Sequence, residues 1–210
     1  MPLHEPKVID PSKLSPLGRD VLSALLKPGI CAEELPAGDP IKDLADNLGS
    51  LFTEAVGFLK TALPNPELRK FGALVWDIVG NRVVPVGVGP NVPTVSFAGY
   101  KQGPVVHGII LLPPFWNKMI KEDPVMQLGA VVYSGSKAID FYNNVIDAGT
   151  LDPRAELYES EYLRTVKQIA PDYEFNAYQK KVIAKYPAGL DSEGAASLKY
   201  ESKPFFVPQA

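Results

Sequence analysis

Side chains that titrate or bind metal ions near neutral pH are scarce in this chain of 210 residues. It has two histidines, His4 and His107, and one cysteine, Cys31, and each is isolated from the others in the sequence. A metal site or a Cys–His catalytic pair needs such groups close together. The chain shows no sequence pattern for either. His107 could still act alone, as a general acid or base, or it could be held by a backbone carbonyl at a strand start.

Tyrosine, serine and lysine side chains cluster in one predicted helix. Tyr133 and Lys137 are four residues apart and share a helical face, and Ser134 and Ser136 lie beside them. The lysine could lower the pKa of the Tyr133 phenol, or the patch could bind an anion. A polar, solvent-facing side of the helix would give the same pattern. Gly135 costs about 1 kcal/mol relative to alanine in mid-helix, which indicates close packing or ligand approach there.

Carboxylates in the second half of the chain could supply acid–base chemistry. Glu156 and Glu159 are three residues apart and share a helical face. If burial separated their pKa values, such a pair could act as acid and base, and Asp140, Glu156 or Glu159 could partner His107. The favoured interpretation is simpler. Both glutamates follow Asp152-Pro153, a predicted helix start, where negative charge stabilises the helix dipole.

Residues 107–163 show an order of elements that resembles a known family. A predicted strand, Gly108-Ile-Ile-Leu-Leu, precedes a helix that contains Gln127 to Lys137. Gly149-Thr150-Leu151-Asp152 and then Ala155-Glu-Leu-Tyr158-Glu159 follow. This layout resembles the aspzincin branch of the zincin metallopeptidases, which includes deuterolysin and the lysine-specific metallo-endopeptidases. The resemblance implies a helix that carries HExxH, and a GTxD turn whose aspartate is the third zinc ligand.

The chain departs from that family at the metal-binding positions. Tyr133-Ser134-Gly135-Ser136-Lys137 stands where HExxH is expected, so both imidazoles and the general-base carboxylate are missing. A catalytic zinc needs about three protein ligands and an open coordination position, and Asp152 alone cannot hold it. The resemblance therefore implies a zincin-like scaffold without its metal, and we expect no cofactor.

Three hypotheses for function follow. The first is a metal-free, zincin-like protein that binds a ligand or partner between the strand at 105–112 and the helix at 124–147. Its expected ligand-binding residues are Tyr133, Ser134, Ser136, Tyr142, Glu156, Tyr158 and Trp116. The second is a cofactor-independent lyase, cyclase or isomerase that acts on a small apolar substrate. Its expected catalytic residues are His107, Tyr133, Lys137 and Asp152. The third is an oligomeric structural or interaction protein whose terminal arms reach a neighbouring copy.

Composition and charge are those of an ordinary globular protein. They do not indicate whether its partner is a small molecule or another protein. Hydrophobic residues make up 46%, charged residues 21%, and the net charge is −3, as in ordinary globular proteins. The sequence has no stripe of lysine and arginine residues of the kind that predicts nucleic-acid binding. The longest apolar run, Val105 to Trp116, is too short to span a bilayer, and the N-terminus lacks a signal-peptide pattern. A lone cysteine cannot form an intramolecular disulfide. We expect a soluble, cytoplasmic protein that binds neither membranes nor nucleic acid.

The elements that would position these residues are predicted from proline placement and apolar periodicity. Helices should begin where a capping residue precedes proline, at Ser15-Pro16, Asp39-Pro40, Asn65-Pro66, Asp123-Pro124 and Asp152-Pro153. Short strands are expected within 82–89, 92–98 and 105–112, and the last is apolar on both faces, as in a central strand. The pattern predicts a mainly helical α+β fold with a small sheet of two to four strands.

The same pattern predicts one domain with two extended arms. The arms are residues 1–14 and 187–210, and a pair of phenylalanines in the second, Phe205 and Phe206, could pack back onto the body. The domain spans 15–186. It is expected to contain a helical layer at 15–80, strands at 82–112 and helices at 115–185.

Overall fold

The computed structural model describes residues 7–8, 40–80, 84, 86–89, 91–102, 105–143, 145 and 148–200. Several predicted features lie outside these residues. They are His4, the helix after Pro16, the loop with Cys31, and the Phe205-Phe206 pair.

Within the described residues the chain forms a mainly helical α+β fold, as predicted. The α-helices are α2 (Pro40–Thr61), α3 (Pro66–Gly80), α4 (Trp116–Glu122), α5 (Pro124–Tyr142), α6 (Ala148–Ile169) and α7 (Ala177–Lys185). The strands are β1 (Lys7–Val8), β2 (Val86–Val88), β3 (Ser96–Gln102) and β4 (Val105–Leu112). None of these helices is long and apolar enough to cross a membrane.

The strands form one mixed sheet in the order β1-β2-β4-β3. The central position predicted for residues 105–112 is confirmed, because β4 pairs in parallel with β2 and antiparallel with β3. Strand β3 therefore lies at an edge of the sheet. Residues 7–8 of the predicted N-terminal arm add a short strand at the other edge, where Lys7 is in register with Gly87.

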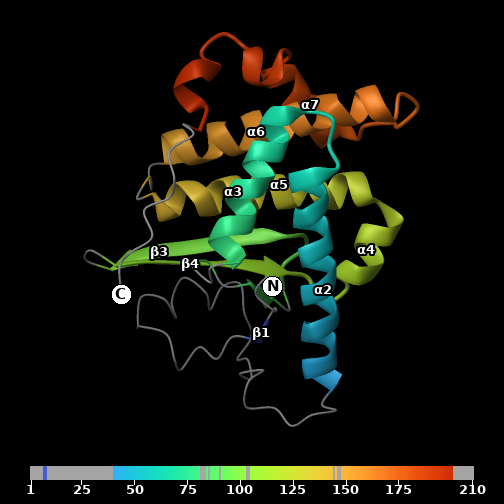
Figure 1. Ribbon diagram of the computed structural model, residues 1–210, viewed down its shortest axis with the longest axis vertical. Helices are drawn as coiled ribbons and strands as arrows, with labels where there is room; N and C mark the ends of the chain where they lie inside the picture. The colour runs from blue at the N-terminus through green and yellow to red at the C-terminus, as the bar shows by residue number, and fades with distance from the viewer. Residues whose placement is uncertain are drawn as a thin grey trace.

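Helices α5, α6 and α7 stack in layers on one side of the sheet (Figure 1). Helix α5 lies against β3 and β4, α6 packs on α5, and α7 packs on α6. Helices α2 and α3 form an antiparallel pair that runs across α5 and the sheet. Helix α5 consequently has neighbours on several sides, and its buried residues include glycine, serine and aspartate as well as apolar side chains.

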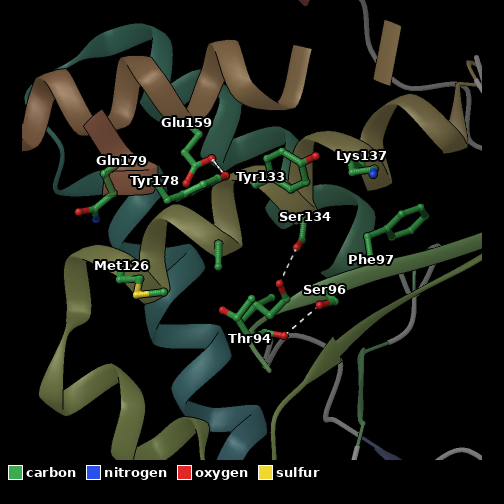
Figure 2. A pocket seen from close by; sticks show the side chains of 12 residues that line it. Thr94, Ser96, Phe97, Met126, Tyr133, Ser134, Lys137, Glu159, Tyr178 and Gln179 are labelled. Carbon is green, nitrogen blue, oxygen red and sulfur yellow. Dashed lines mark hydrogen bonds between the residues drawn. The ribbon is translucent and has the colours of Figure 1, made fainter. Parts of the chain in front are cut away.

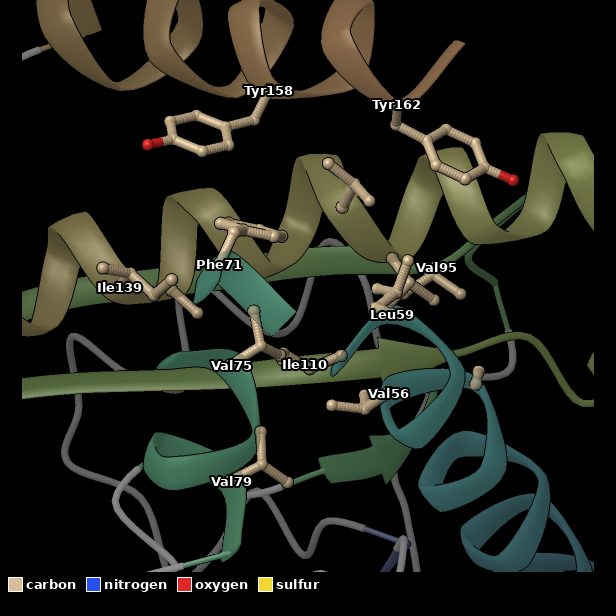
Figure 3. Close-up of a cluster of buried hydrophobic side chains, with 14 of the residues drawn as sticks. Val56, Leu59, Phe71, Val75, Val79, Val95, Ile110, Ile139, Tyr158 and Tyr162 are labelled. Carbon is tan, nitrogen blue, oxygen red and sulfur yellow. The ribbon is translucent and has the colours of Figure 1, made fainter. Parts of the chain in front are cut away.

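Apolar side chains from every layer meet in one hydrophobic core (Figure 3). Phe71 and Val75 of α3 and Ile110 of β4 lie among residues that are almost fully buried. Tyr158 and Tyr162 extend from α6 toward α5 and α3 in the same cluster. The core thus joins the helical layers to the sheet and fixes α5 and α6 relative to each other.

Paired glycines let α5 approach the sheet closely. Gly99 of β3 and Gly108 of β4 are cross-strand partners. A Cβ atom at Gly99 would lie 2.8 Å from the Phe141 ring, and one at Gly108 would lie 2.7 Å from the Phe97 ring. Phe97 and Phe141 pack edge-to-face with centroids 5.4 Å apart. The two rings occupy the space that side chains at the glycines would fill.

The cap-then-proline pattern correctly predicts three helix starts among these elements, at Pro40, Pro66 and Pro124, and misplaces one. Asn65 caps α3 by accepting from Glu67 N and Leu68 N, and Asp123 caps α5 by accepting from Met126 N at 2.9 Å. Helix α6 instead begins at Ala148, so Pro153 lies inside it. Pro153 is the sixth residue of α6, beyond the first four residues whose N–H groups have no intrahelical partner, so it removes one backbone hydrogen bond from the helix.

The predicted extended tail is wrong for residues 187–200. This segment contains two short 3₁₀ helices, η3 (Gly189–Asp191) and η4 (Ala195–Leu198), which pack on α6. Leu190 and Ala195 are buried in the hydrophobic core. The apolar side chains of this segment reach α6, and their burial outweighs the tendency of a proline- and glycine-containing segment to stay extended.

Gly72 provides a test of how closely α3 packs on α2. A Cβ atom there would lie 2.6 Å from the backbone of Leu59 and Lys60, whereas one at Gly57 would lie 3.7 Å from the Trp76 ring. We expect Gly72→Ala to destabilise the protein by about 2 kcal/mol or more, because the helix backbones must separate. Gly57→Ala should be neutral or stabilise by up to about 1 kcal/mol. Urea unfolding of both variants measures the difference, and equal effects would contradict this packing.

Candidate ligand-binding site

Three predicted site residues meet at the interface of α5 and α6. Asp152, in the first turns of α6, accepts hydrogen bonds through the same oxygen, Oδ1, from two groups of α5. Lys137 Nζ donates to it at 2.8 Å, and the Tyr133 hydroxyl donates at 3.1 Å. The lysine ammonium also lies 5.4 Å from the centre of the Tyr133 ring. The GTxD segment is therefore the helical start of α6, and its aspartate faces Tyr133 and Lys137, the positions at which the aspzincin resemblance predicts histidines.

The charges in this group are balanced internally. The hydrogen bond from Lys137 is the main reason that the pKa of Asp152 lies below its usual value. The pKa of Tyr133 is raised, first by burial and then by the negative charge of Asp152. The expectation that Lys137 lowers the pKa of this phenol is therefore wrong. The lysine faces the phenol, but burial and the aspartate outweigh its effect.

A cavity of about 410 Å³ opens beside this group (Figure 2). Its strand wall is formed by residues 94–97, at the start of edge strand β3, and not by the predicted segment 105–112. The opposite wall comes from α5, and Glu159 of α6 and residues of α7 close the remaining side. Tyr133 and Ser134, which are predicted ligand-binding residues, and Lys137, which is a predicted catalytic residue, line the cavity.

Ser134 and Phe97 position the two walls of the cavity. The buried hydroxyl of Ser134 donates to the carbonyl oxygen of Val95 at 3.0 Å, which ties α5 to the strand wall (Figure 2). Phe97 is held by Phe141 and by the space above Gly108. Met126 and Ala130 add apolar surface from the preceding turns of α5. The surface of the cavity is thus mainly apolar, with polar groups on both the strand wall and the helices.

Glu159 is the buried carboxyl group of this cavity. Its Oε2 accepts a hydrogen bond of 2.6 Å from the Tyr178 hydroxyl of α7, and its side chain points from α6 toward the cavity (Figure 2). Burial raises the pKa of Glu159 to about 7, although the bond from Tyr178 opposes this, and nearby Glu156 adds a smaller upward effect. Tyr133 and Tyr162 also face it. Because α6 begins at Ala148, the helix-dipole interpretation of Glu156 and Glu159 is wrong.

Other predicted ligand-binding residues lie elsewhere in the described part of the chain. Trp116 is fully buried in the core against Phe52, and Tyr158 stacks on Phe71 with centroids 4.9 Å apart. Tyr142 is the last residue of α5 and packs against the core. Glu156 forms an ion pair with Lys185. Aromatic type and helical spacing do not distinguish a core position from a pocket wall, and none of these residues lines the cavity.

Ser136 belongs to a separate buried polar cluster. Its hydroxyl lies 2.7 Å from that of Tyr200, which also donates to the Ser136 carbonyl oxygen at 2.9 Å. Asp140, one turn later, forms a buried ion pair with Arg154 of α6. Burial raises the pKa of Asp140 to about 6 despite the arginine. Arg154 also donates through Nε to the Leu198 carbonyl oxygen. This cluster holds residues 198–200 on the body, and Ser136 is structural.

The predicted close packing at Gly135 is confirmed, and the position of His107 is partly described. A Cβ atom at Gly135 would lie 2.8 Å from a methyl group of Val75, so the glycine allows α3 to approach α5. His107 lies in β4, where its backbone pairs with that of Tyr100. Its side chain is outside the described part of the structure, so its predicted catalytic role stays a prediction.

The residues at the aspzincin-like positions do not fit a zinc ion. Asp152 is the only potential anionic ligand in its group, and the Lys137 ammonium already contacts it. Among the described residues, no group of three or more histidine, cysteine, aspartate or glutamate side chains could hold a metal. No matching protein family, curated protein or solved structure is found for this chain. The comparisons therefore neither support nor contradict the resemblance to the aspzincins.

Sequence reasoning did not assign Tyr178 or Glu159, two of the polar residues of the cavity, to the site, although it considered Glu159 as an acid–base group. Tyr178 gave no signal, because it follows a short loop and its contact with Glu159 depends on how α7 folds back. Glu159 did give one. It lies four residues after Ala155 and three before Tyr162, so it falls on the apolar stripe that α6 buries. A carboxylate within such a stripe indicates a buried, perturbed acid.

The raised pKa of Glu159 predicts a specific dependence of stability on pH. Its pKa of about 7 exceeds the ordinary value of 4.5, so its protonated form stabilises the fold below pH 4.5 and that stabilisation is lost as pH rises through 7. Glu159→Gln should therefore gain stability relative to the unmodified protein between these pH values, by on the order of 3 kcal/mol. Urea unfolding at several pH values measures this difference.

The Tyr178 hydrogen bond supplies a matched control for that measurement. Tyr178→Phe removes a donor that favours the ionised carboxylate, so the midpoint of Glu159 should move to higher pH. Carbon-13 NMR of the glutamate side-chain carboxyl follows both midpoints directly. A midpoint near 4.5 in the unmodified protein would contradict the burial of this acid.

Proposed function

We propose that this protein is a metal-free, zincin-like scaffold that binds a ligand or a protein partner in the cavity beside Tyr133, Lys137 and Glu159. The observation that carries the proposal is the contact of Asp152 with both Lys137 and Tyr133. These residues occupy the positions that the aspzincin resemblance assigns to the three metal ligands. A zincin-like scaffold predicts that these three residues lie together. A chance match of the GTxD motif predicts no such contact.

A lysine at one ligand position explains how the scaffold can persist without metal. In a zincin the ion neutralises the aspartate and holds two helices together. Here the Lys137 ammonium contacts Asp152 and the Tyr133 hydroxyl adds a second hydrogen bond, so the carboxylate keeps cationic and neutral donors. The ammonium and a metal ion would compete for the same oxygen. The group is therefore a structural link between α5 and α6 that forms one wall of the cavity.

The cavity supports a binding role through its size and its surface chemistry. A volume of about 410 Å³ lies in the range of small-molecule sites. The apolar side chains of Val95, Phe97 and Met126 can bury an aliphatic or aromatic group, and Glu159 with Tyr178 can receive a hydrogen bond from it. A ligand that combines an apolar group with amide or hydroxyl groups fits both features.

Restoring the missing imidazoles tests whether these positions form a zincin-like metal site. We expect Tyr133→His together with Lys137→His to create zinc affinity, because Asp152 would provide the third ligand. Equilibrium dialysis or calorimetry with zinc chloride measures the affinity. Adding Asp152→Asn to the pair should weaken binding by about tenfold or more, since one anionic ligand is lost.

An exposed pair of positions gives the matched control for the zinc experiment. Lys118 and Glu122 of α4 are also four residues apart, and their side chains are exposed. Lys118→His with Glu122→His therefore supplies two imidazoles at the same spacing without a facing aspartate. If the Tyr133/Lys137 double variant binds zinc no more tightly than this control, the proposed correspondence is wrong.

A neutral probe tests whether the cavity binds ligands. N-acetylphenylalaninamide offers an aromatic group and amide groups, and we expect it to shift the backbone NMR signals of Ala130, Ser134 and Tyr178 in a saturable way. Ala130→Trp should abolish these shifts by filling the cavity, and its thermal unfolding checks that the variant is folded. Shifts that persist in Ala130→Trp, or that occur only outside the cavity, would contradict the binding role.

A further inference from the structure

A second cavity lies between α6 and α7, apart from the one beside Tyr133. It has a volume of about 490 Å³ and uses Lys180, Ile183 and Ala184 of α7, whereas the first cavity uses Tyr178 and Gln179. Because a helix turns by about 100° per residue, these two sets lie on different faces of α7. The second cavity shares no lining residue with the first and is an independent candidate site.

The floor of the α6–α7 cavity is apolar. Phe175, from the segment before α7, and Ile183 contribute half-buried side chains that also pack against the hydrophobic core. Ala184 and Pro187 extend this surface toward the end of α7. The floor can therefore accept several methylene groups of a ligand, and each one buried adds to the affinity.

Three cationic side chains line the same cavity, and no carboxylate lines it. Arg164 lies 4.0 Å from Glu161 Oε2, but that oxygen already accepts a hydrogen bond of 2.8 Å from Leu190 N. Lys167 donates to the carbonyl oxygens of residues 171 and 173, which are neutral acceptors. The side chain of Lys180 forms no ion pair or hydrogen bond with any described residue.

This concentration of positive charge contrasts with the chain as a whole, whose net charge is −3. Lys167 has neutral acceptors and the Phe175 ring, whose centre lies 5.8 Å from its Nζ, but no ion pair among the described residues, and the long contact of Arg164 compensates its charge weakly. An anionic group at the rim would meet three cations, while its apolar part would cover Phe175 and Ile183. A fully apolar ligand would leave these three positive charges without a partner. A cationic ligand would be repelled by them.

We propose that the α6–α7 cavity binds an amphiphilic carboxylate, a free alkyl or arylalkyl acid whose chain lies on the apolar floor and whose carboxylate contacts Arg164, Lys167 and Lys180. The structure favours a single molecule over a bilayer surface. Of the large hydrophobic side chains that are strongly exposed among the described residues, only Ile169 lies on α6 and only Tyr178 on α7, and neither lines this cavity. A membrane-binding face would need more exposed apolar side chains around the rim.

Sodium decanoate, used below its critical micelle concentration, is the probe. Isothermal titration calorimetry measures its affinity, and backbone NMR locates it. We expect saturable binding that shifts the signals of Arg164, Lys167 and Ile183, and that weakens as salt is added. Lys180→Gln and Arg164→Gln should each reduce the affinity, and the double variant should reduce it by about tenfold. Lys118→Gln, an exposed lysine of α4, is the matched control and should leave the affinity unchanged.

Three further arms make the result decisive. Decanol and decyltrimethylammonium keep the chain and change the head group, so both should bind more weakly than decanoate. Ala184→Trp should block binding by filling the floor, whereas Ala130→Trp, in the first cavity, should not affect it. Vesicles that contain phosphatidylglycerol should not bind the protein in a sedimentation assay.

The proposal is wrong if decanol binds as tightly as decanoate, or if the shifts map to Ala130 and Ser134. It is also wrong if no saturable binding of decanoate occurs, or if the vesicles bind while free decanoate does not. These outcomes are independent of the zinc and N-acetylphenylalaninamide experiments, because the two cavities share no lining residue.

Discussion

The close packing of α5 between the sheet, α3 and α6 is the constraint on which the rest of the structure depends. Three contacts make it possible, and each uses a glycine. Gly135 admits Val75 of α3, Gly129 leaves room for the Glu159 carboxyl of α6, and Gly108 lies beneath the aromatic pair that seats α5 on the sheet. With these contacts in place, the start of α6 passes beside Tyr133 and Lys137 of α5. The geometry of the candidate site is therefore a consequence of backbone packing.

Burial then decides how the polar groups between α5 and α6 behave. Asp152 is partly exposed and accepts from an ammonium, so its charged form is favoured and its pKa is lowered. Glu159 and Asp140 lie deeper, and desolvation raises their pKa values to about 7 and about 6. One helix interface thus holds a neutralised ion pair at its edge and acids that titrate near neutrality inside. Ligand contact with Glu159 would change its protonation, whereas Asp152 is already satisfied by Lys137.

The amino-acid sequence predicts the fold better than the site. Caps before Pro66 and Pro124 and the two-sided apolar character of residues 105–112 are local signals, and the structure follows them. Asp152-Pro153 shows the same local pattern, but Asp152 is used across the helix interface and α6 begins earlier. Site residues such as Trp116 and Tyr158 could not be assigned from type and spacing. On helices packed on several sides, only the tertiary arrangement decides which face lines a cavity, and which enters the core.

We propose that a lysine ammonium, and not a metal ion, neutralises Asp152 in a zincin-like arrangement. The most direct test is the zinc content of the unmodified protein after incubation with excess zinc chloride and gel filtration, measured by inductively coupled plasma mass spectrometry. We expect far less than one zinc ion per chain, and no loss of the Lys137–Asp152 contact in the NMR signals of either side chain. One tightly bound zinc ion per chain, lost on substitution of Asp152, would contradict the claim.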